Sequence, residues 1–504
     1  MMIRNFKWLV LASLTLAACS DDDSASTVDE PITAGSADLS KYVALGDSFA
    51  AGYSDNALFK KGQENSYPNI IASQFALAGG GSFAQPLMVD NVGGFSMGGV
   101  QISAFPTRLY FNGTGPANVP GVSGTVFGTT VAGPFNNFGV PGAKSFHLGA
   151  AGYGTLNPYF GRFASSATAS PFSDALAQNP TFFTLWIGGN DVLAYATSGG
   201  TGTNQTGNFN PATYGGNDIT DPTVFDNVYN SMIDGLTANG AKGAVGNLPY
   251  VNTLPFFTTV PYNPVPLDAT TATTLNTQLL GPLKQILTAL GEGDRINLVA
   301  AGSTNPLLIV DQNLTNYSAQ ITGALMLGGV PGPQATLMGN LYGQARHAKK
   351  SADGTFRDFI LLPTRNIIGT TQAGVPAPFN TVGVTYPLQD AAVLTNAEAG
   401  EVRVATDAYN ITIEGAASAH GLALFDSKAT LNQLLNGGIR FGNYHMTTSY
   451  VTGGAFSLDG IHPSARGYAL IANRFLEAIN ATYGSNFKGA DLGDYQIQYP
   501  VLLP

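Results

Sequence analysis

KYVALGDS, residues 41–48, is the first stretch of the chain with a clear structural signature. Residues 42–45 are apolar and rich in β-formers, and the run stops at Gly46, which is followed by Asp47 and Ser48. A short apolar run that stops at Gly-Asp-Ser predicts a buried strand leading into a tight turn. The class of fold then depends on whether similar strands recur along the chain.

Four further short apolar runs predict strands of the same kind, at residues 182–187, 241–247, 296–300 and 422–425. Helical patterns at residues 68–78, 224–238, 274–290 and 431–435 lie between the runs or border them. Short apolar strands that alternate with helices predict an α/β fold, in which helices sandwich a parallel sheet. In such sheets, ligands bind beyond the carboxyl ends of the strands.

Three separate segments carry polar side chains at such positions. GDSF (46–49) follows the first expected strand, GGND (188–191) follows the strand at 182–187, and DGIHP (459–463) precedes a helix that ends near residue 483. In the last segment, Asp459 lies three residues before His462. A carboxylate at this spacing can hold an imidazole in one tautomer and stabilise its protonated form, which is what a serine nucleophile needs from its base.

On these residues the chain resembles the GDSL/SGNH hydrolases, a family of lipases and esterases, and all four of its short blocks occur in order. The resemblance implies that Ser48 is the nucleophile, that His462 is the base, and that Asp459 orients His462. It also implies that the chain has the family's flavodoxin-like sheet, interrupted here by large loop insertions. Phe49 stands where the family usually has leucine, an apolar change that we expect to be tolerated.

The resemblance also implies the members of an oxyanion hole. These are the backbone N–H groups of Ser48 and Gly142, the latter at the end of NFGVPG (137–142), and the side-chain amide of Asn190. The implied activity is hydrolysis of a small-molecule ester through an acyl-enzyme, with no cofactor and no metal. A carbohydrate deacetylase of the same fold stays an alternative, as does a surface lipoprotein that binds a ligand without catalysis.

Competing motifs in the sequence are weaker. GFSMG (94–98) satisfies the G-x-S-x-G pattern of a nucleophile elbow, but Gly93 interrupts the approaching strand and the residues that follow are a poor helix start, so Ser96 is not expected to react. The remaining histidines, His147, His347, His420 and His445, show no paired spacing typical of metal ligands.

The N-terminus resembles that of a bacterial lipoprotein. Arg4 and Lys7 precede an apolar run at residues 8–18, which is too short for a membrane span. Cys19 follows at the position that is lipidated in such proteins, and it is the only cysteine, so no intramolecular disulfide can form. We therefore expect a signal peptide at residues 1–18, a lipid anchor on Cys19, and export to the outer membrane, on its periplasmic or its cell-surface face.

Composition defines the remaining expectations. The 504 residues include 22 Lys+Arg and 32 Asp+Glu, an acidic balance that argues against nucleic acid as a partner. Residues 19–40 read as an acidic tether, residues 41–485 as one hydrolase domain, and residues 486–504 as a tail. We expect insertions near 76–134, 195–221 and 306–421. The sequence does not indicate an oligomeric state.

Overall fold

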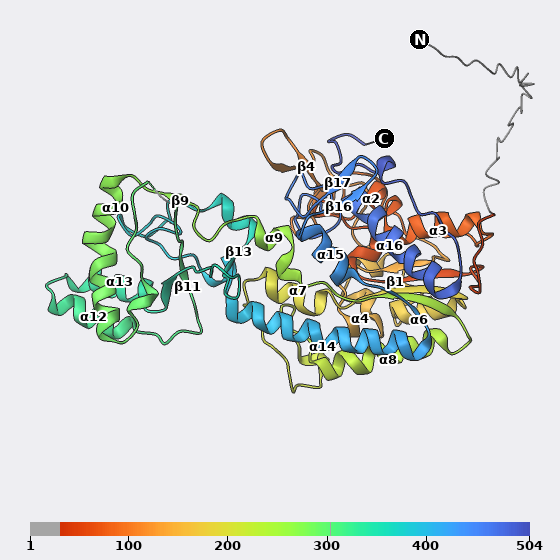
Figure 1. The fold of residues 1–504 in the computed structure, drawn as a ribbon, viewed down its shortest axis with the longest axis horizontal. Coiled ribbons are helices and arrows are strands. Elements are labelled where there is room, and N and C mark those ends of the chain that lie inside the picture. The colour runs from red at the N-terminus through yellow and green to blue at the C-terminus, as the bar shows by residue number, and fades with distance from the viewer. Residues whose placement is uncertain (1–30, 303, 504) are drawn as a thin grey trace, which may run out of the picture.

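In the computed structural model, which describes residues 31–302 and 304–503, five parallel strands form a central sheet (Figure 1). Their spatial order is β6-β1-β7-β8-β15. Numbered along the chain within this sheet, that order is 2-1-3-4-5, which is characteristic of flavodoxin-like folds. The prediction of a parallel α/β sheet is confirmed. The strands are β1 (Tyr42–Gly46), β6 (Asn137–Gly139), β7 (Phe182–Trp186), β8 (Lys242–Gly246) and β15 (Ala423–Phe425).

The neighbouring strands β1 and β7 bring two of the predicted segments together. Their register pairs Gly46 with Trp186, so the chain leaves both strands at the same level. A side chain at Gly46 would collide with the Trp186 carbonyl oxygen, because a Cβ there would lie 2.5 Å from it. Glycine at position 46 therefore allows the two strand ends to approach closely, and GDSF and GGND emerge side by side.

Two strand predictions differ from the structure. Strand β6 was not expected, because its three residues are too few to give a periodic signal. The strand expected at 296–300 is wrong: this segment is not a strand, and Ile296 is buried in a separate hydrophobic cluster with Leu283 and Leu287. A short apolar run indicates that a segment is buried, but it does not indicate a strand, because an irregular segment can also be buried.

Helices cover both faces of the sheet (Figure 1). On one face α3 (Tyr67–Leu77) packs against α16 (Ala465–Tyr483), where Tyr67 and Phe475 stack with ring centroids 5.0 Å apart. On the other face lie α6 (Pro171–Ala177), α8 (Pro222–Thr237) and α14 (Asn396–His420), and α8 packs along α14. A large cluster of apolar and aromatic side chains fills the space between the layers.

Helix α14 corrects one expected boundary, since it lies inside the insertion expected at 306–421 yet packs on the central sheet. Its start carries a capping box, in which Thr395 Oγ1 accepts from Glu398 N and Glu398 Oε2 accepts from Thr395 N. Its end carries Gly421 at φ 61°. Both signals are visible in the sequence, where Thr-x-x-Glu opens a helix and glycine closes it.

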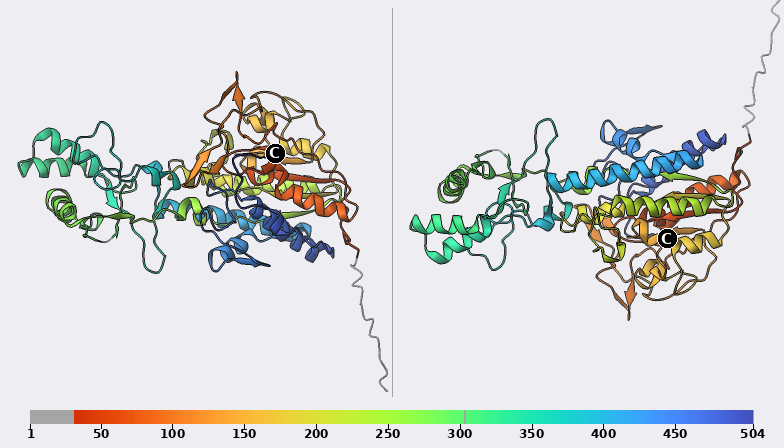
Figure 2. Two further views of the ribbon diagram at one scale, coloured as in Figure 1. Left: turned by 90° about the horizontal axis from the view of Figure 1, so that it is seen from above. Right: turned by 90° about the horizontal axis from the view of Figure 1, so that it is seen from below.

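The chain between α9 (Pro255–Thr258) and α14 forms a second lobe that projects from the sheet domain (Figures 1 and 2). This lobe has its own hydrophobic clusters, and the helix expected at 274–290 belongs to it. Its elements are β9 (Val265–Pro266), α10 (Ala269–Leu275), a π-helix (Asn276–Leu280), α11 (Gly281–Ala289), β10 (Thr304–Asn305), β11 (Leu308–Val310), α12 (Ser318–Leu327), α13 (Gly332–Tyr342), β12 (Ala345–His347), β13 (Phe359–Ile360) and β14 (Val393–Leu394).

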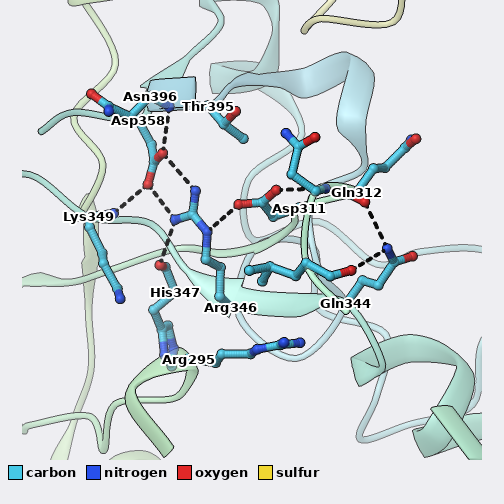
Figure 3. Close-up of polar contacts among 12 residues, drawn as sticks. Arg295, Asp311, Gln312, Gln344, Arg346, His347, Lys349, Asp358, Thr395 and Asn396 are labelled. Carbon is cyan, nitrogen blue, oxygen red and sulfur yellow. Dashed lines mark hydrogen bonds and ion pairs between the residues drawn. The ribbon is translucent and has the colours of Figure 1, made fainter. Parts of the chain in front are cut away.

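A buried ion-pair network joins the second lobe to α14 (Figure 3). Arg346 donates to Asp311 at 2.7 Å and, through two nitrogens, to both oxygens of Asp358 at 2.6 and 2.8 Å. Asp358 also accepts from the backbone N–H groups of Lys349 and of Asn396, the first residue of α14. The network thus ties strand β12 to the start of a helix that packs on the sheet.

We expect Arg346→Met to lower the free energy of unfolding by about 3–5 kcal/mol, because it leaves the buried carboxylates of Asp311 and Asp358 without their cation. Urea unfolding monitored by circular dichroism measures this loss. Arg474→Met is the matched control: Arg474 pairs with the exposed Glu477, and removing such a pair costs about 1 kcal/mol or less. Equal midpoints for the two variants would contradict the prediction.

The first and the last described segments of the chain pack on the sheet domain. Residues 31–40 of the expected tether are not free, because Ser36 N bonds Tyr483 O at 2.8 Å and Leu39 is buried. The expected tail also packs, with Arg108 donating to Pro500 O at 2.7 Å. The expected signal peptide and Cys19 lie outside the described residues and stay predictions. Among the described residues, no helix is long and apolar enough to span a membrane.

The remaining elements lie in the loops around the sheet. The insertion expected near 76–134 contains the hairpins β2 (Ser96–Met97) with β3 (Val100–Gln101) and β4 (Leu109–Phe111) with β5 (Pro116–Asn118). The others are α1 (Ser48–Ala51), α2 (Lys60–Glu64), α4 (Ser145–Leu148), α5 (Pro158–Gly161), α7 (Asn190–Thr197), α15 (Ser427–Leu435), β16 (Ile439–Phe441) and β17 (Tyr444–Met446).

Candidate active site

Ser48, His462 and Asp459 form one hydrogen-bonded chain at the carboxyl end of β1. Ser48 is the first residue of α1, directly after the turn that ends β1, and His462 lies in the loop before α16. His462 Nε2 lies 2.9 Å from Ser48 Oγ, and His462 Nδ1 lies 2.9 Å from Asp459 Oδ2. These are hydrogen-bonding distances between a hydroxyl, an imidazole and a carboxylate. The structure brings together three side chains from opposite ends of the chain.

Asp459 is held in place on both oxygens. Its Oδ1 accepts from the backbone N–H groups of Ile461 and His462, each at 2.8 Å, and its Oδ2 accepts from Asn56 N at 3.0 Å as well as contacting His462 Nδ1. Burial opposes ionisation of Asp459, but His462 and these N–H groups outweigh it and keep its pKa below the ordinary value. Asp459 is therefore an ionised carboxylate that is held by three backbone N–H groups as well as by the His462 ring.

Two other buried carboxyl groups near His462 behave differently. Burial raises the pKa of Asp47 to about 7, even though its side chain accepts from Phe49 N at 2.9 Å. Burial likewise raises the pKa of Asp55 to about 7. When neighbouring environments push the pKa values of carboxyl groups apart, the groups differ in chemical role. Of these three, Asp459 is the one whose surroundings favour the charged form.

Asn190 and Gly142 lie at the ends of strands that flank this chain of residues. Asn190 begins α7, and its Nδ2 donates to Ala143 O at 3.0 Å. An amide nitrogen has two N–H groups, so this bond leaves a second one for a substrate oxygen. Gly142 is the neighbour of Ala143 and adopts φ 79°, a conformation that favours glycine. The bond from Asn190 thus links two of the predicted oxyanion-hole segments.

Asp191 makes a second link between these segments, which sequence reasoning missed. Its carboxylate accepts from both the backbone N–H and the hydroxyl of Ser145, at 2.8 and 2.7 Å, and it is fully buried. The loop at residues 142–145 is therefore held by both polar residues of the GGND segment. The one available signal was that segment itself, in which Asp191 directly follows Asn190.

We expect Asn190→Ala to reduce kcat for ester hydrolysis about 10²- to 10³-fold, because it removes the predicted oxyanion donor and releases the Ala143 carbonyl. Steady-state kinetics with a p-nitrophenyl ester measures the loss, with circular dichroism to verify folding. Asn230→Ala is the control, since Asn230 bonds Asp226 on α8. A wild-type rate in Asn190→Ala would remove this residue from the site.

A tight turn at residues 54–57 contacts Asp459 and its neighbour Leu458, and the sequence analysis does not predict it. Asp55 and Asn56 both have positive φ, 51° and 62°, a conformation that Asp and Asn tolerate better than most residues. Asp55 accepts from Leu458 N at 2.9 Å and is 1 % exposed, while Asn56 N donates to Asp459. The turn therefore couples the segment after Ser48 to the loop that carries His462. Local sequence shows nothing of this contact between distant segments.

We expect Asp55→Ala to lower kcat for ester hydrolysis about tenfold or more, since it removes the acceptor for Leu458 N and puts alanine at a positive φ. Asparagine keeps an acceptor oxygen and tolerates a positive φ, so Asp55→Asn is expected to keep most of the parent rate. Comparing kcat and KM of the two variants measures the effect. If alanine and asparagine act alike, the turn does not position Asp459 through this side chain.

Aromatic rings surround the His462 imidazole. The ring centroid of Tyr53 lies 4.6 Å from that of His462, and the centroid of Phe49 lies 5.4 Å from it. Phe49 also packs edge-on against Trp186, with centroids 5.1 Å apart. These contacts leave only 12 % of the His462 side chain exposed. Phe49 thus contributes a ring to the site.

The other sequence candidates lie elsewhere. Ser96 sits in the short hairpin strand β2, where it bonds Thr125, so the GFSMG pattern does not form a strand-turn-helix elbow. His147 and His347 accept backbone N–H groups, and burial lowers the pKa of each to about 4. Across residues 31–302 and 304–503, no three His, Cys, Asp or Glu side chains gather as a metal would require.

Comparison with known proteins adds little to this geometry. No family model matches the chain, and no curated protein matches it. Among solved structures, an extracellular lipase from Streptomyces rimosus is similar to 88 % of this chain and 99 % of its own, at 11 % identity and a TM-score of 0.28. A similarity this low carries no argument about fold or function, so the functional conclusion rests on the site.

Proposed function

We propose that this protein is a serine hydrolase of the SGNH type that cleaves carboxylic esters. The observation that carries the proposal is the chain of two 2.9 Å contacts from Ser48 Oγ through His462 to Asp459. A hydroxyl, an imidazole and an ionised carboxylate in this order are the parts that activate a serine nucleophile. The 2-1-3-4-5 strand order and the four sequence blocks support the family assignment.

The mechanism follows from the positions of these groups. Ser48 Oγ attacks the ester carbonyl while His462 Nε2 takes the hydroxyl proton, and Asp459 stabilises the imidazolium that forms. The backbone N–H groups of Ser48 and Gly142 and the amide of Asn190 bind the oxyanion. When the tetrahedral intermediate collapses, His462 returns the proton to the departing alcohol, and an acyl group remains on Ser48.

Deacylation repeats the same steps with water. His462 Nε2 takes a proton from a water molecule, and the resulting hydroxide attacks the acyl-Ser48 carbonyl. Collapse of the second tetrahedral intermediate returns the proton to Ser48 Oγ and releases the carboxylic acid. The same sequence of steps serves any acyl ester, so the triad alone does not separate a lipid esterase from a carbohydrate deacetylase.

A fluorophosphonate probe tests the proposal directly, because it reacts covalently with an activated serine. We expect one probe per chain, with peptide mapping placing it on Ser48, together with hydrolysis of short p-nitrophenyl esters. The Ser96→Ala variant should react with the probe and hydrolyse the esters as the parent protein does, since Ser96 contacts neither His462 nor Asp459. Absence of labelling in the folded protein would instead favour a ligand-binding lipoprotein without catalysis.

A further inference from the structure

A cavity of about 90 Å³ lies beside the triad, at the carboxyl ends of β7, β8 and β15. Trp186 and Phe425 come from two of these strands, and helices α7, α15 and α16 supply the walls with side chains that include Val192, Leu431 and Leu470. One water needs roughly 10–15 Å³ of cavity volume of this kind. The space is therefore large enough for a chain of several methylene groups.

The polar groups around this cavity are largely engaged elsewhere. Trp186 Nε1 donates to Asn247 O at 3.0 Å, and the Ser427 hydroxyl donates to the same oxygen. Asp47 accepts from Phe49 N, and Asn190 donates to Ala143 O. What the cavity presents is then almost entirely hydrocarbon and aromatic surface. A sugar in this space would leave its hydroxyl groups without partners, which is costly.

Residues of the active site form the wall of the cavity nearest the triad. Phe49 directly follows Ser48 and lines the cavity, and its ring centroid lies 5.4 Å from that of His462. Asn190 and Ile461 also line it, the first a proposed oxyanion donor and the second the neighbour of His462. The cavity thus begins at the residues that would surround the reacting carbonyl.

We infer that this cavity binds the acyl chain of the substrate, so that the enzyme acts on esters of unbranched fatty acids of medium length rather than on acetate esters. The inference rests on the proposed function. An acetyl group would fill only a small part of the apolar space. Each further methylene that leaves water contributes a free energy equivalent to roughly a fourfold gain in kcat/KM.

A chain-length series of p-nitrophenyl esters from acetate to dodecanoate tests this inference. We expect kcat/KM to rise on the order of 100-fold from acetate to hexanoate, and to stop rising once the cavity is full. The quantity to compare between variants is the ratio of kcat/KM for hexanoate to that for acetate. This ratio cancels losses that affect both substrates equally.

Two variants fill the cavity from different walls. Leu431→Trp acts from α15 and Leu193→Trp from α7, where Leu193 is only half-buried and a larger ring is easier to accommodate. We expect each to lower the hexanoate-to-acetate ratio at least tenfold. Leu435→Trp is the matched control, because Leu435 lies on the same helix as Leu431 but does not line the cavity. Its ratio should equal that of the parent protein.

The outcomes separate the two proposals. If the protein hydrolyses p-nitrophenyl esters and labels at Ser48 but shows a flat chain-length profile, the acyl-chain inference is overturned and the proposed function stands. The inference is also overturned if both cavity-filling variants fold and keep the parent ratio. If no ester is hydrolysed and Ser48 takes no fluorophosphonate, the proposed function itself fails.

Discussion

Ser48→Ala is expected to lower kcat for ester hydrolysis by about 10⁵- to 10⁶-fold, the largest effect of any single change in this chain. The reason is that Ser48 Oγ is the atom that His462 Nε2 contacts at 2.9 Å, and alanine leaves the base with no nucleophile to activate. Removing the nucleophile of such a triad costs about as much as removing all three members. The loss corresponds to about 7–8 kcal/mol of transition-state stabilisation.

The measurement is the rate of p-nitrophenol release at saturating ester, together with loss of fluorophosphonate labelling. Circular dichroism should be unchanged, because Ser48 lies in α1 and its side chain contacts His462, outside the sheet. Ser96→Ala provides the control for serine removal as such. If Ser48→Ala keeps more than a hundredth of the parent rate, Ser48 is not the nucleophile and another residue must fill that role.

Asp459→Asn is expected to lower kcat about 10⁴-fold while leaving the fold intact. The asparagine oxygen should take the place of Oδ1, where the N–H groups of Ile461 and His462 both require an acceptor. The amide NH₂ then faces Asn56 N and His462 Nδ1 in place of Oδ2. His462 has to present its lone pair at Nδ1 and its proton at Nε2, so it cannot accept the proton of Ser48.

Steady-state kinetics measures this loss, with kcat and KM determined separately. KM should change little, because Asp459 lies behind His462 and does not line the cavity. Asp268→Asn is the control, since Asp268 is an exposed carboxylate that caps helix α10 in the second lobe. A kcat within tenfold of the parent value would show that Asp459 does not set the tautomer of His462.

The sequence alone predicted the elements with strong local signals. Strands β1, β7, β8 and β15 were recognised because each is a short apolar run bounded by turn residues, and α16 because its apolar positions repeat at helical spacing. The candidate residues Ser48, Asn190, Asp459 and His462 could be named because they stand at the ends of such elements, within short blocks that resemble a known family. In each case the information lies within a few neighbouring residues.

Other features depended on contacts between residues far apart in sequence. The segment at 296–300 and the helix expected at 274–290 have apolar patterns that fit the sheet, yet they pack in the second lobe, because hydrophobicity specifies burial and not which core is joined. The same reason applies to residues 396–420, which the sequence assigns to an insertion and which form helix α14 on the sheet. The tertiary structure as a whole determines which core each apolar face packs against.

For the site itself, local sequence determined which residue types are present, and the tertiary structure decided how they are supported. Nothing near Asp459 in the sequence indicates that Asn56 donates to it, and nothing near Phe49 indicates that its ring lies against His462 and also lines an apolar cavity. Hydrogen-bond geometry and cavity shape arise only when segments hundreds of residues apart meet, because both depend on distances of a few ångströms between elements. The sequence therefore determined the chemistry that Ser48, His462 and Asp459 can perform, and the tertiary structure decided what surrounds them.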